Sequence, residues 1–324
     1  MTDSRRRPIG YERRLEERRR RASERGGKKP WMRILMVGLA FCLILSCSAA
    51  CIYGCFHKKE VSGSSINDNV TQVNATTRKQ DSNSGAKHIN SDETLVEKPA
   101  PLTDRSEIIM EKTNFIVSYN TDTFCPNYVA WHLTKDRVNG DVSRTNNFHP
   151  DETLPFEFQV MPSDYSNSGY DRGHMCPAAD NKDSYEHMRN SFLMTNICPQ
   201  NRNLNAGDWN DLEVQCRSWV NKYDDLYIVC GPIFNEGIPL TIGKPDRMQI
   251  VVPDAFFKVV LVMGQKPKAI GFMYPNASGH RKIKDYAVSV DEVENRTGID
   301  FYYSLPDDTE EEIEFECNPA SWGL

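Results

Sequence analysis

The residues of this 324-residue chain whose types and spacing could do chemistry lie between Tyr170 and Glu213. Within that stretch, His174 follows Asp171-Arg172-Gly173 and is followed by Met175-Cys176-Pro177. The glycine permits a turn or a close backbone approach, and the proline ends regular structure soon afterwards. We therefore expect His174 to project from a turn or strand end, where an imidazole with a reference pKa of ~6.5 can serve as a base. A structural histidine is the alternative for an isolated residue, and the surrounding motif argues against it.

A second polar group begins thirty-one residues after His174, in the run Asn205-Ala206-Gly207-Asp208-Trp209. From this point apolar residues recur at the spacing of one helical face. They are Trp209, Leu212, Cys216, Trp219 and Val220. We expect Asp208 to be the N-cap of this helix, which would place Asn205 just before its first turn. Glu213 and Arg217 lie four residues apart and could pair on one face, as in an ordinary surface pair.

Together these pieces resemble the DNA/RNA non-specific endonucleases. This family of ββα-metal nucleases includes the secreted Serratia nuclease and mitochondrial endonuclease G. The residues that carry the resemblance are Asp171-Arg172-Gly173-His174, Asn196, Asn205, Gly207, Trp209, Glu213 and Arg217. The similarity extends from about Tyr128 to Asp308 and includes residues 128–134 and 290–298.

The resemblance implies an enzyme that hydrolyses phosphodiester bonds in DNA and RNA. His174 would be the general base toward water, a contribution typically worth ~10²–10⁴-fold. Asn205 would be the ligand of Mg²⁺, which commonly keeps several waters and binds substrate phosphate directly, with Mn²⁺ as a substitute. Glu213 would orient water at the ion, and the products would carry a 5′-phosphate.

By the same resemblance, Arg144 and Arg172 would bind the scissile phosphate through their forked guanidinium groups. Arg144 lies in a polar loop of variable length, so an exposed loop arginine is the alternative. Asn196 and Arg217 are expected on the substrate-binding side of the site, with Asn196 supporting it through hydrogen bonds. Because contacts to phosphate carry no base information, we expect little sequence preference.

The charge of the chain limits how it could hold nucleic acid. Residues 57–324 have 26 basic and 40 acidic side chains, a net of −14, so a globally basic nucleic-acid footprint is absent. A nuclease of this composition would use a local basic cleft and a bound cation. Two other functions stay open: a catalytically idle nucleic-acid receptor on the same fold, and a non-nuclease phosphodiesterase or phosphatase with the same metal chemistry.

Short apolar runs between turn residues predict the strands that position these side chains. They are residues 115–117, 128–133, 226–230, 248–252, 256–262 and 269–273. Helices are predicted at 182–190 and at 289–297, where Ser289 is the cap, while the acidic stretch 307–316 is expected to be solvated. The pattern indicates an α+β fold with a mixed, mainly antiparallel sheet core and flanking helices. The ββα-metal finger around the motif comes from the resemblance.

Three further parts precede the catalytic region. Residues 1–30 hold twelve basic side chains against five acidic ones, a net of +7, and are assigned as a basic cytoplasmic tail. Residues 31–56 are almost wholly apolar and long enough to span a bilayer, so we assign them as a transmembrane signal-anchor with the catalytic domain outside the cytoplasm. Residues 57–103 are a flexible polar linker, and 104–324 are the endonuclease domain. The alternatives are a cleaved signal peptide or a lipoprotein and, for the tail, a nucleic-acid patch.

Ten cysteines divide into four within the apolar segment and six beyond it. The six suit up to three disulfide bonds in an exported domain, and the pair we expect first is Cys176 with Cys198. A zinc site formed by those thiols with His174 and His187 is the alternative, although the spacing matches no compact zinc motif. Besides nucleic acid and the membrane contacted by residues 31–56, a homodimer is the remaining expected partner.

Overall fold

The computed structural model describes residues 95–324. The expected tail 1–30, the transmembrane segment 31–56 and most of the linker lie outside these residues. Within the described part of the chain, no helix combines the length and the apolar character needed to cross a membrane.

The end of the expected linker is part of the folded domain. Glu97 and Ala100 are buried, and the Ala100 amide donates to the Asp300 carbonyl at 2.9 Å. Leu102 packs against the core. The domain boundary at residue 104 was therefore placed too late, because these few apolar residues follow a long polar stretch that conceals them.

A seven-stranded sheet forms the centre of the domain, and each neighbouring pair of its strands is antiparallel. In spatial order the strands are β1 (Ile108–Glu111), β2 (Ile116–Asn120), β3 (Cys125–Thr134), β6 (Asp225–Ile233), β9 (Ala255–Val262), β10 (Lys268–Pro275) and β11 (Ala287–Val288). Most side chains on both faces of β3, β6 and β9 are buried, as their nearly continuous apolar runs indicate. The expected α+β class with a mainly antiparallel sheet is confirmed.

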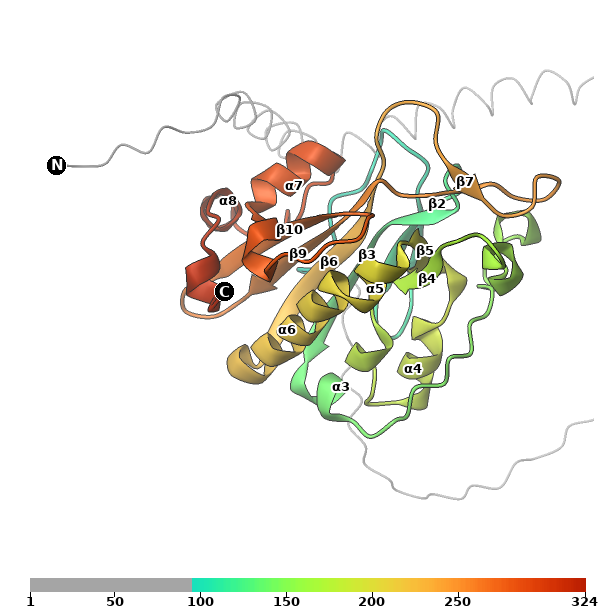
Figure 1. Cartoon of the computed structure of the whole chain (residues 1–324). Helices are drawn as coiled ribbons and strands as arrows, with labels where there is room; N and C mark the ends of the chain where they lie inside the picture. The colour runs from blue at the N-terminus through green and yellow to red at the C-terminus, as the bar shows by residue number, and fades with distance from the viewer. Residues whose placement is uncertain (1–94) are drawn as a thin grey trace, which may run out of the picture. The chain divides into compact units, whose positions relative to one another are not determined.

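Helices cover both faces of this sheet (Figure 1). On one face, Trp209 of α6 (Asp208–Tyr223) shares a hydrophobic cluster with Phe256 of β9. On the other face, Val293 of α7 (Val290–Thr297) and Ile313 of α8 (Asp307–Phe315) share a cluster with Phe257. Successive strand residues point to opposite faces, so Phe256 and Phe257 belong to different layers of the core.

The remaining elements are short. They are β4 (Asp171–His174), β5 (Ile197–Gln200), β7 (Thr241–Ile242), β8 (Ile250–Val251), α3 (Lys135–Asn139), α4 (Tyr185–Ser191), α5 (Arg202–Ala206) and 3₁₀ helices at Phe156–Phe158, Pro162–Tyr165, Ala178–Asp180, Met194–Asn196, Ile283–Tyr286 and Pro319–Trp322. β4 pairs with β5 and β7 with β8, outside the large sheet. The strand predicted at 248–252 is thus reduced to β8.

Two helix starts follow their sequence signals. Ser289 caps α7 by accepting a hydrogen bond from the Glu292 amide at 3.1 Å, and Gly298 ends that helix with a φ of 71°. Ser184 caps α4 in the same way, through the His187 amide at 3.1 Å.

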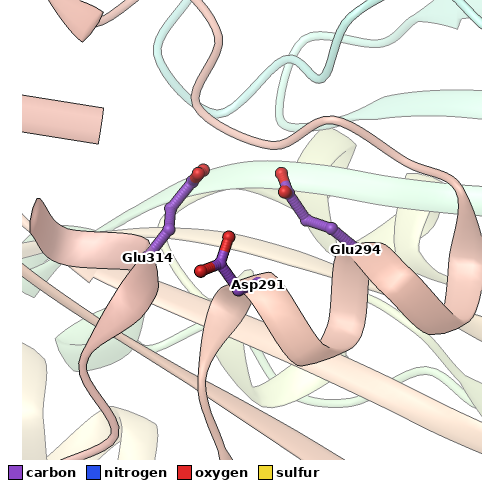
Figure 2. Close-up of side chains that lie close together, drawn as sticks. All are labelled: Asp291, Glu294 and Glu314. Carbon is purple, nitrogen blue, oxygen red and sulfur yellow. The ribbon is translucent and has the colours of Figure 1, made fainter. Parts of the chain in front are cut away.

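The acidic stretch 307–316 is solvated only in part: Asp307, Asp308, Glu312 and Glu316 are exposed as predicted, but the prediction is wrong for the other face. It forms α8, in which Glu310 and Glu314 are buried one turn apart. Glu314 converges with Asp291 and Glu294 of α7, and the ligand atoms of the three carboxylates lie within 4.8 Å of one another (Figure 2). The high charge of the stretch concealed a helical period that directs one face into the core.

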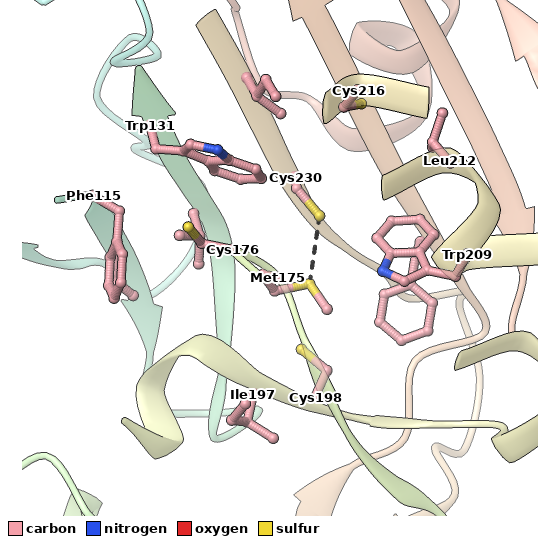
Figure 3. Close-up of a cluster of buried hydrophobic side chains, with 14 of the residues drawn as sticks. Phe115, Trp131, Met175, Cys176, Ile197, Cys198, Trp209, Leu212, Cys216 and Cys230 are labelled. Atoms are coloured by element: carbon pink, nitrogen blue, oxygen red, sulfur yellow. Dashed lines mark hydrogen bonds between the residues drawn. The ribbon is translucent and has the colours of Figure 1, made fainter. Parts of the chain in front are cut away.

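The six cysteines in residues 95–324 are free thiols, so the expected Cys176–Cys198 disulfide is not found. Cys198 lies on β5 opposite Gly173, whereas Cys176 lies past the end of β4, where its Sγ accepts a hydrogen bond from Asn181 Nδ2 at 3.3 Å. Figure 3 shows both among apolar core side chains. Buried thiols of this kind act as small apolar residues.

Candidate active site

β4 and β5 form the antiparallel pair that carries the Asp-Arg-Gly-His motif, with Gly173 opposite Cys198 and His174 opposite Ile197. A Cβ atom on Gly173 would lie 2.6 Å from the Cβ atom of the buried Gln200, so only glycine fits at this position. The residues after His174 enter the core, where Met175 Sδ lies 3.8 Å from a cysteine Sγ of β6 (Figure 3). Because α5 and α6 follow β5, these elements form the ββα unit that the motif led us to expect.

His174 is deeply set, with 7% of its surface exposed. Its ring centroid lies 5.3 Å from that of Phe148 and 5.1 Å from that of Phe192. Burial, and then the charge of Arg144, lower the pKa of His174 to about 3. The imidazole is therefore neutral at physiological pH, and its Nε2 accepts or donates no hydrogen bond within residues 95–324.

The two phenylalanines beside His174 also hold the two candidate phosphate-binding arginines. The guanidinium carbon of Arg144 lies 5.2 Å from the Phe192 centroid, and that of Arg172 lies 4.7 Å from the Phe148 centroid. Both arginines are exposed, and cation–π contacts of this kind use no N–H donor, although Arg144 Nε donates to Asn146 Oδ1 at 2.6 Å. The structure thus brings Arg144, Arg172 and His174 to one place.

The loop that carries Arg144 and Phe148 is fixed at its far end. His149 forms an isolated bridge with Leu193, in which the His149 amide donates to the Phe192 carbonyl at 3.1 Å and the Met194 amide donates to the His149 carbonyl at 2.9 Å. This bridge explains how a loop outside the motif reaches His174.

Asn205 lies within α5, one helix earlier than we expected. The Asn201 side chain caps α5, and Gly207 separates it from α6. Asp208 is the first residue of α6, and the cap is Gly207. The Asp208 Oδ2 atom accepts from the Tyr286 hydroxyl at 2.5 Å. Asn205 Nδ2 donates to Asp171 Oδ2 at 3.0 Å, and its Oδ1 accepts no hydrogen bond within the described residues.

Asn196 is fully buried, and its amide is already satisfied. Nδ2 donates to the carbonyls of Cys176 and Ser191, each at 2.8 Å, and Oδ1 accepts from the Cys176 amide at 2.9 Å. Both N–H donors are used and the side chain is fully buried, so Asn196 is placed to support the chain after His174 and not to contact a substrate directly.

Arg217 does not pair with Glu213. Its guanidinium donates instead to Asp180 Oδ1 at 3.0 Å, and Asp180 is buried. Glu213 touches solvent, but so many protein atoms surround its carboxyl that burial raises its pKa to about 7, against the opposing charge of Lys258. A proton on this carboxyl is thus exchanged near physiological pH.

The family of the chain follows from its match to a protein-family model. The model of the DNA/RNA non-specific endonucleases matches residues 91–308. The chain belongs to this family. It is therefore a nuclease, a hydrolase that acts on phosphodiester bonds.

Individual relatives of this endonuclease are matched over different shares of their length. A nuclease from Nostoc sp. is 36% identical over 228 residues, which are 67% of this chain and 80% of the relative. The mitochondrial nuclease EXOG of Danio rerio is 35% identical over 206 residues, which are 60% of each chain. A crystal structure of EndoG in complex with EndoGI superposes with a TM-score of 0.58 at 27% identity, covering 62% of this chain and 88% of that one. The match to EXOG thus spans less than two thirds of its length.

Two features of the endonuclease site escaped the sequence. Phe148 lies in a polar loop without periodicity, so its aromatic side chain was the only sequence feature that could have indicated a place in the site. Lys258 is 1% exposed on β9, with Nζ 4.6 Å from the Trp209 centroid and 5.7 Å from the Trp131 centroid. Its position within the apolar run Phe256–Val262 could have indicated a buried charge from the sequence.

The zinc alternative receives no support from the arrangement. Within residues 95–324, the group of His, Cys, Asp or Glu side chains close enough to share an ion is the acidic one of α7 and α8 in Figure 2. His187 is engaged with Asp183, through Nδ1 at 2.9 Å. His174 and the two thiols of the motif therefore form no zinc site.

Proposed function

We propose that this endonuclease hydrolyses DNA and RNA with little sequence preference, using His174 as the general base and Asn205 as the ligand of a divalent metal ion. The observation that carries the proposal is the state of His174. Its ring is buried and neutral, with Nε2 unused by the described residues, and two guanidinium groups lie on the aromatic rings around it. A neutral imidazole beside phosphate-binding groups can take a proton from an attacking water.

The two arginines would hold the substrate. Arg144 and Arg172 are exposed, and their planar donor groups match the oxygens of a phosphodiester. These contacts read the backbone and not the bases, which supports low sequence preference. The bound phosphate also brings negative charge beside His174, which opposes the effect of Arg144 and makes the imidazole a stronger base in the complex.

Asn205 fits the role of a metal ligand. Asp171 fixes the amide through Nδ2, and Oδ1 is left as an oxygen ligand. We propose Mg²⁺, with Mn²⁺ as a substitute, because Mg²⁺ takes oxygen ligands and keeps several of its waters. When bound, the ion would supply Lewis-acid stabilisation of the leaving 3′-oxygen. Glu213 would orient water through its carboxylate, and Asn196 and Arg217 would hold the surrounding chain in place.

A cleavage assay tests the catalytic proposal. Full-length protein is incubated with supercoiled plasmid and with single-stranded RNA, in Mg²⁺ or in EDTA, beside His174→Ala and the matched control His187→Ala. We expect loss of both substrates in Mg²⁺, protection in EDTA, a fall of ~10²–10⁴-fold in His174→Ala and near-normal activity in the control. Near-normal cleavage by a folded His174→Ala protein would remove His174 from the role of base. No cleavage by the folded wild-type protein would favour a nucleic-acid receptor.

We further propose that residues 31–56 anchor the protein in a membrane, with the N-terminus in the cytoplasm and the catalytic domain outside. The apolar composition of that segment and the basic residues before it support this topology. Protease added to intact cells should digest the catalytic domain and spare an N-terminal tag. Protection of the domain would contradict the topology. The homodimer stays a prediction that light scattering on purified protein would check.

A further inference from the structure

Positive charge gathers on one loop next to α5. The loop between β10 and β11, residues 276–286, carries Arg281, Lys282 and Lys284, and α5 adds Arg202. All four side chains are exposed, and together they are termed the basic patch. Residues 57–324 have a net charge of −14, so this grouping opposes the charge of the domain.

Hydrogen bonds fix the loop against the helix that carries Asn205. Asn276 Oδ1 accepts from the Asn201 amide at 2.7 Å, and Ser278 Oγ accepts from Asn203 Nδ2 at 2.9 Å. The loop and the first turn of α5 therefore form one unit, and the basic patch is held at a fixed place beside the candidate metal ligand.

The carboxylates on these segments are used by groups other than the four cations. Asp208 Oδ2 accepts from the Tyr286 hydroxyl at 2.5 Å and from the Arg281 amide at 3.2 Å. Asp285 accepts from the Lys282 amide at 3.3 Å. Both acidic residues thus stabilise the loop backbone.

The cationic groups of the patch are consequently available. Within residues 95–324, none of the four side chains forms an ion pair or a side-chain hydrogen bond, whereas Lys98, Lys112 and Arg247 are each paired with a carboxylate. The Arg281 guanidinium has only a ring contact, 6.0 Å from the Tyr286 centroid. Guanidinium and ammonium groups in this state bind phosphate.

We propose that the basic patch binds backbone phosphates of a nucleic-acid strand outside the scissile linkage. Exposed cations on the helix of the proposed metal ligand, and on the loop hydrogen-bonded to that helix, can contact several phosphates of one strand. The patch would give long substrates a second attachment that a single phosphodiester lacks. The inference rests on the proposed function, because α5 is then the helix that holds the catalytic ion.

The test compares a long and a minimal substrate in the full-length protein. The variant R281Q/K282Q/K284Q is set beside K222Q/K244Q/K266Q, which removes the same charge from exposed lysines elsewhere on the domain. KM and kcat are measured in Mg²⁺ on a duplex of thirty base pairs at several salt concentrations, and on bis(p-nitrophenyl) phosphate. The three single variants and a circular dichroism spectrum accompany each set, so that a misfolded triple variant does not decide the result.

We expect the patch variant to raise KM for the duplex by about tenfold or more, with kcat little changed, because phosphate contacts outside the scissile linkage contribute to binding. Each lost phosphate contact should also lower the salt slope of binding by ~0.9. Hydrolysis of the small diester should be unaffected, and the control should show neither a comparable rise nor a lower slope. Equal KM and equal salt slope for the patch and control variants would overturn the inference. Failure of the wild-type protein to cleave either substrate would instead refute the proposed function.

Discussion

Replacement of Glu213 by glutamine tests the electrostatics of the site through stability. Burial is the main reason that the pKa of this carboxyl rises from 4.5 to about 7, while Lys258 opposes the rise and Asp180 adds to it. A folded-state pKa above the unfolded value means that folding favours the protonated form. The resulting stability is fully present below pH 4.5 and is lost as the pH rises through about 7.

The size of the effect follows from the interval between the two pKa values. At 1.36 kcal/mol per pH unit, an interval from 4.5 to about 7 corresponds to about 3 kcal/mol. Glu213 has some solvent contact, so about 2 kcal/mol is the expected loss between pH 5 and pH 8. Glutamine cannot ionise, and Glu213→Gln should therefore become more stable than wild type by about this amount at pH 8 relative to pH 5.

Chemical unfolding in EDTA measures this difference without a metal ion in the site. Four tryptophans are buried in the described core, Trp131, Trp209, Trp219 and Trp322, so their fluorescence reports unfolding. Comparing each variant with itself at two pH values removes constant effects of the substitution. Glu312→Gln, at an exposed position of α8, is the control and should show no comparable pH dependence. If the free energies of unfolding of wild type and Glu213→Gln differ by the same amount at pH 5 and at pH 8, the Glu213 carboxyl is not desolvated in the folded protein.

Three further changes probe the surroundings of His174. Phe148→Ala admits water beside His174, so the pKa of His174 should rise from about 3 toward its ordinary value, and ring resonances that titrate as in the wild-type protein would contradict this. Gly173→Ala forces β4 away from Gln200, which should lower the free energy of unfolding by about 1–3 kcal/mol and turnover by more than tenfold. Chemical unfolding and plasmid cleavage measure the two effects. Wild-type values for both would show that the strands tolerate a Cβ atom. Asn196→Ala leaves buried backbone groups without partners and should lower the free energy of unfolding by about 1–3 kcal/mol per group, whereas a loss of substrate affinity at unchanged stability would return Asn196 to substrate binding.

Local patterns in the sequence were sufficient for much of the fold. β3 and β9 are long apolar runs, and α7 has a serine at its cap and a glycine at its end, so each is specified by neighbouring residues. His174 and Asn205 were recognisable because their motifs are contiguous. In the structure, Asn205 contacts the other motif through Asp171, whose Oδ2 accepts from Asn205 Nδ2 at 3.0 Å.

Features that depend on distant segments could not be predicted. Arg217 has a possible partner one helical turn away in Glu213, but Asp180, 37 residues earlier, is the group it contacts. Asp180 is buried and would lack a counter-charge without Arg217, whereas Glu213 remains partly solvated. The ion pair therefore stabilises the Asp180 carboxylate more than it would stabilise Glu213. Phe148 reaches His174 only through the bridge between His149 and Leu193, which no sequence periodicity encodes.

Lys258 shows how the core and the catalytic charges depend on each other. Its ammonium group is 1% exposed and forms no ion pair within residues 95–324. Burial of such a charge costs several kcal/mol, and contacts with the faces of Trp131 and Trp209 each offset about 2 kcal/mol of that cost. Negative charge near α6 must offset part of the remaining cost of burying the ammonium group. Glu213, one turn after Trp209 on α6, is one of the groups that interact with Lys258. Because this attraction acts on both partners, loss of the lysine would raise the pKa of Glu213 further and favour its protonated form. The lysine buried behind α6 thus belongs to the electrostatics of the active site, although it contacts no substrate.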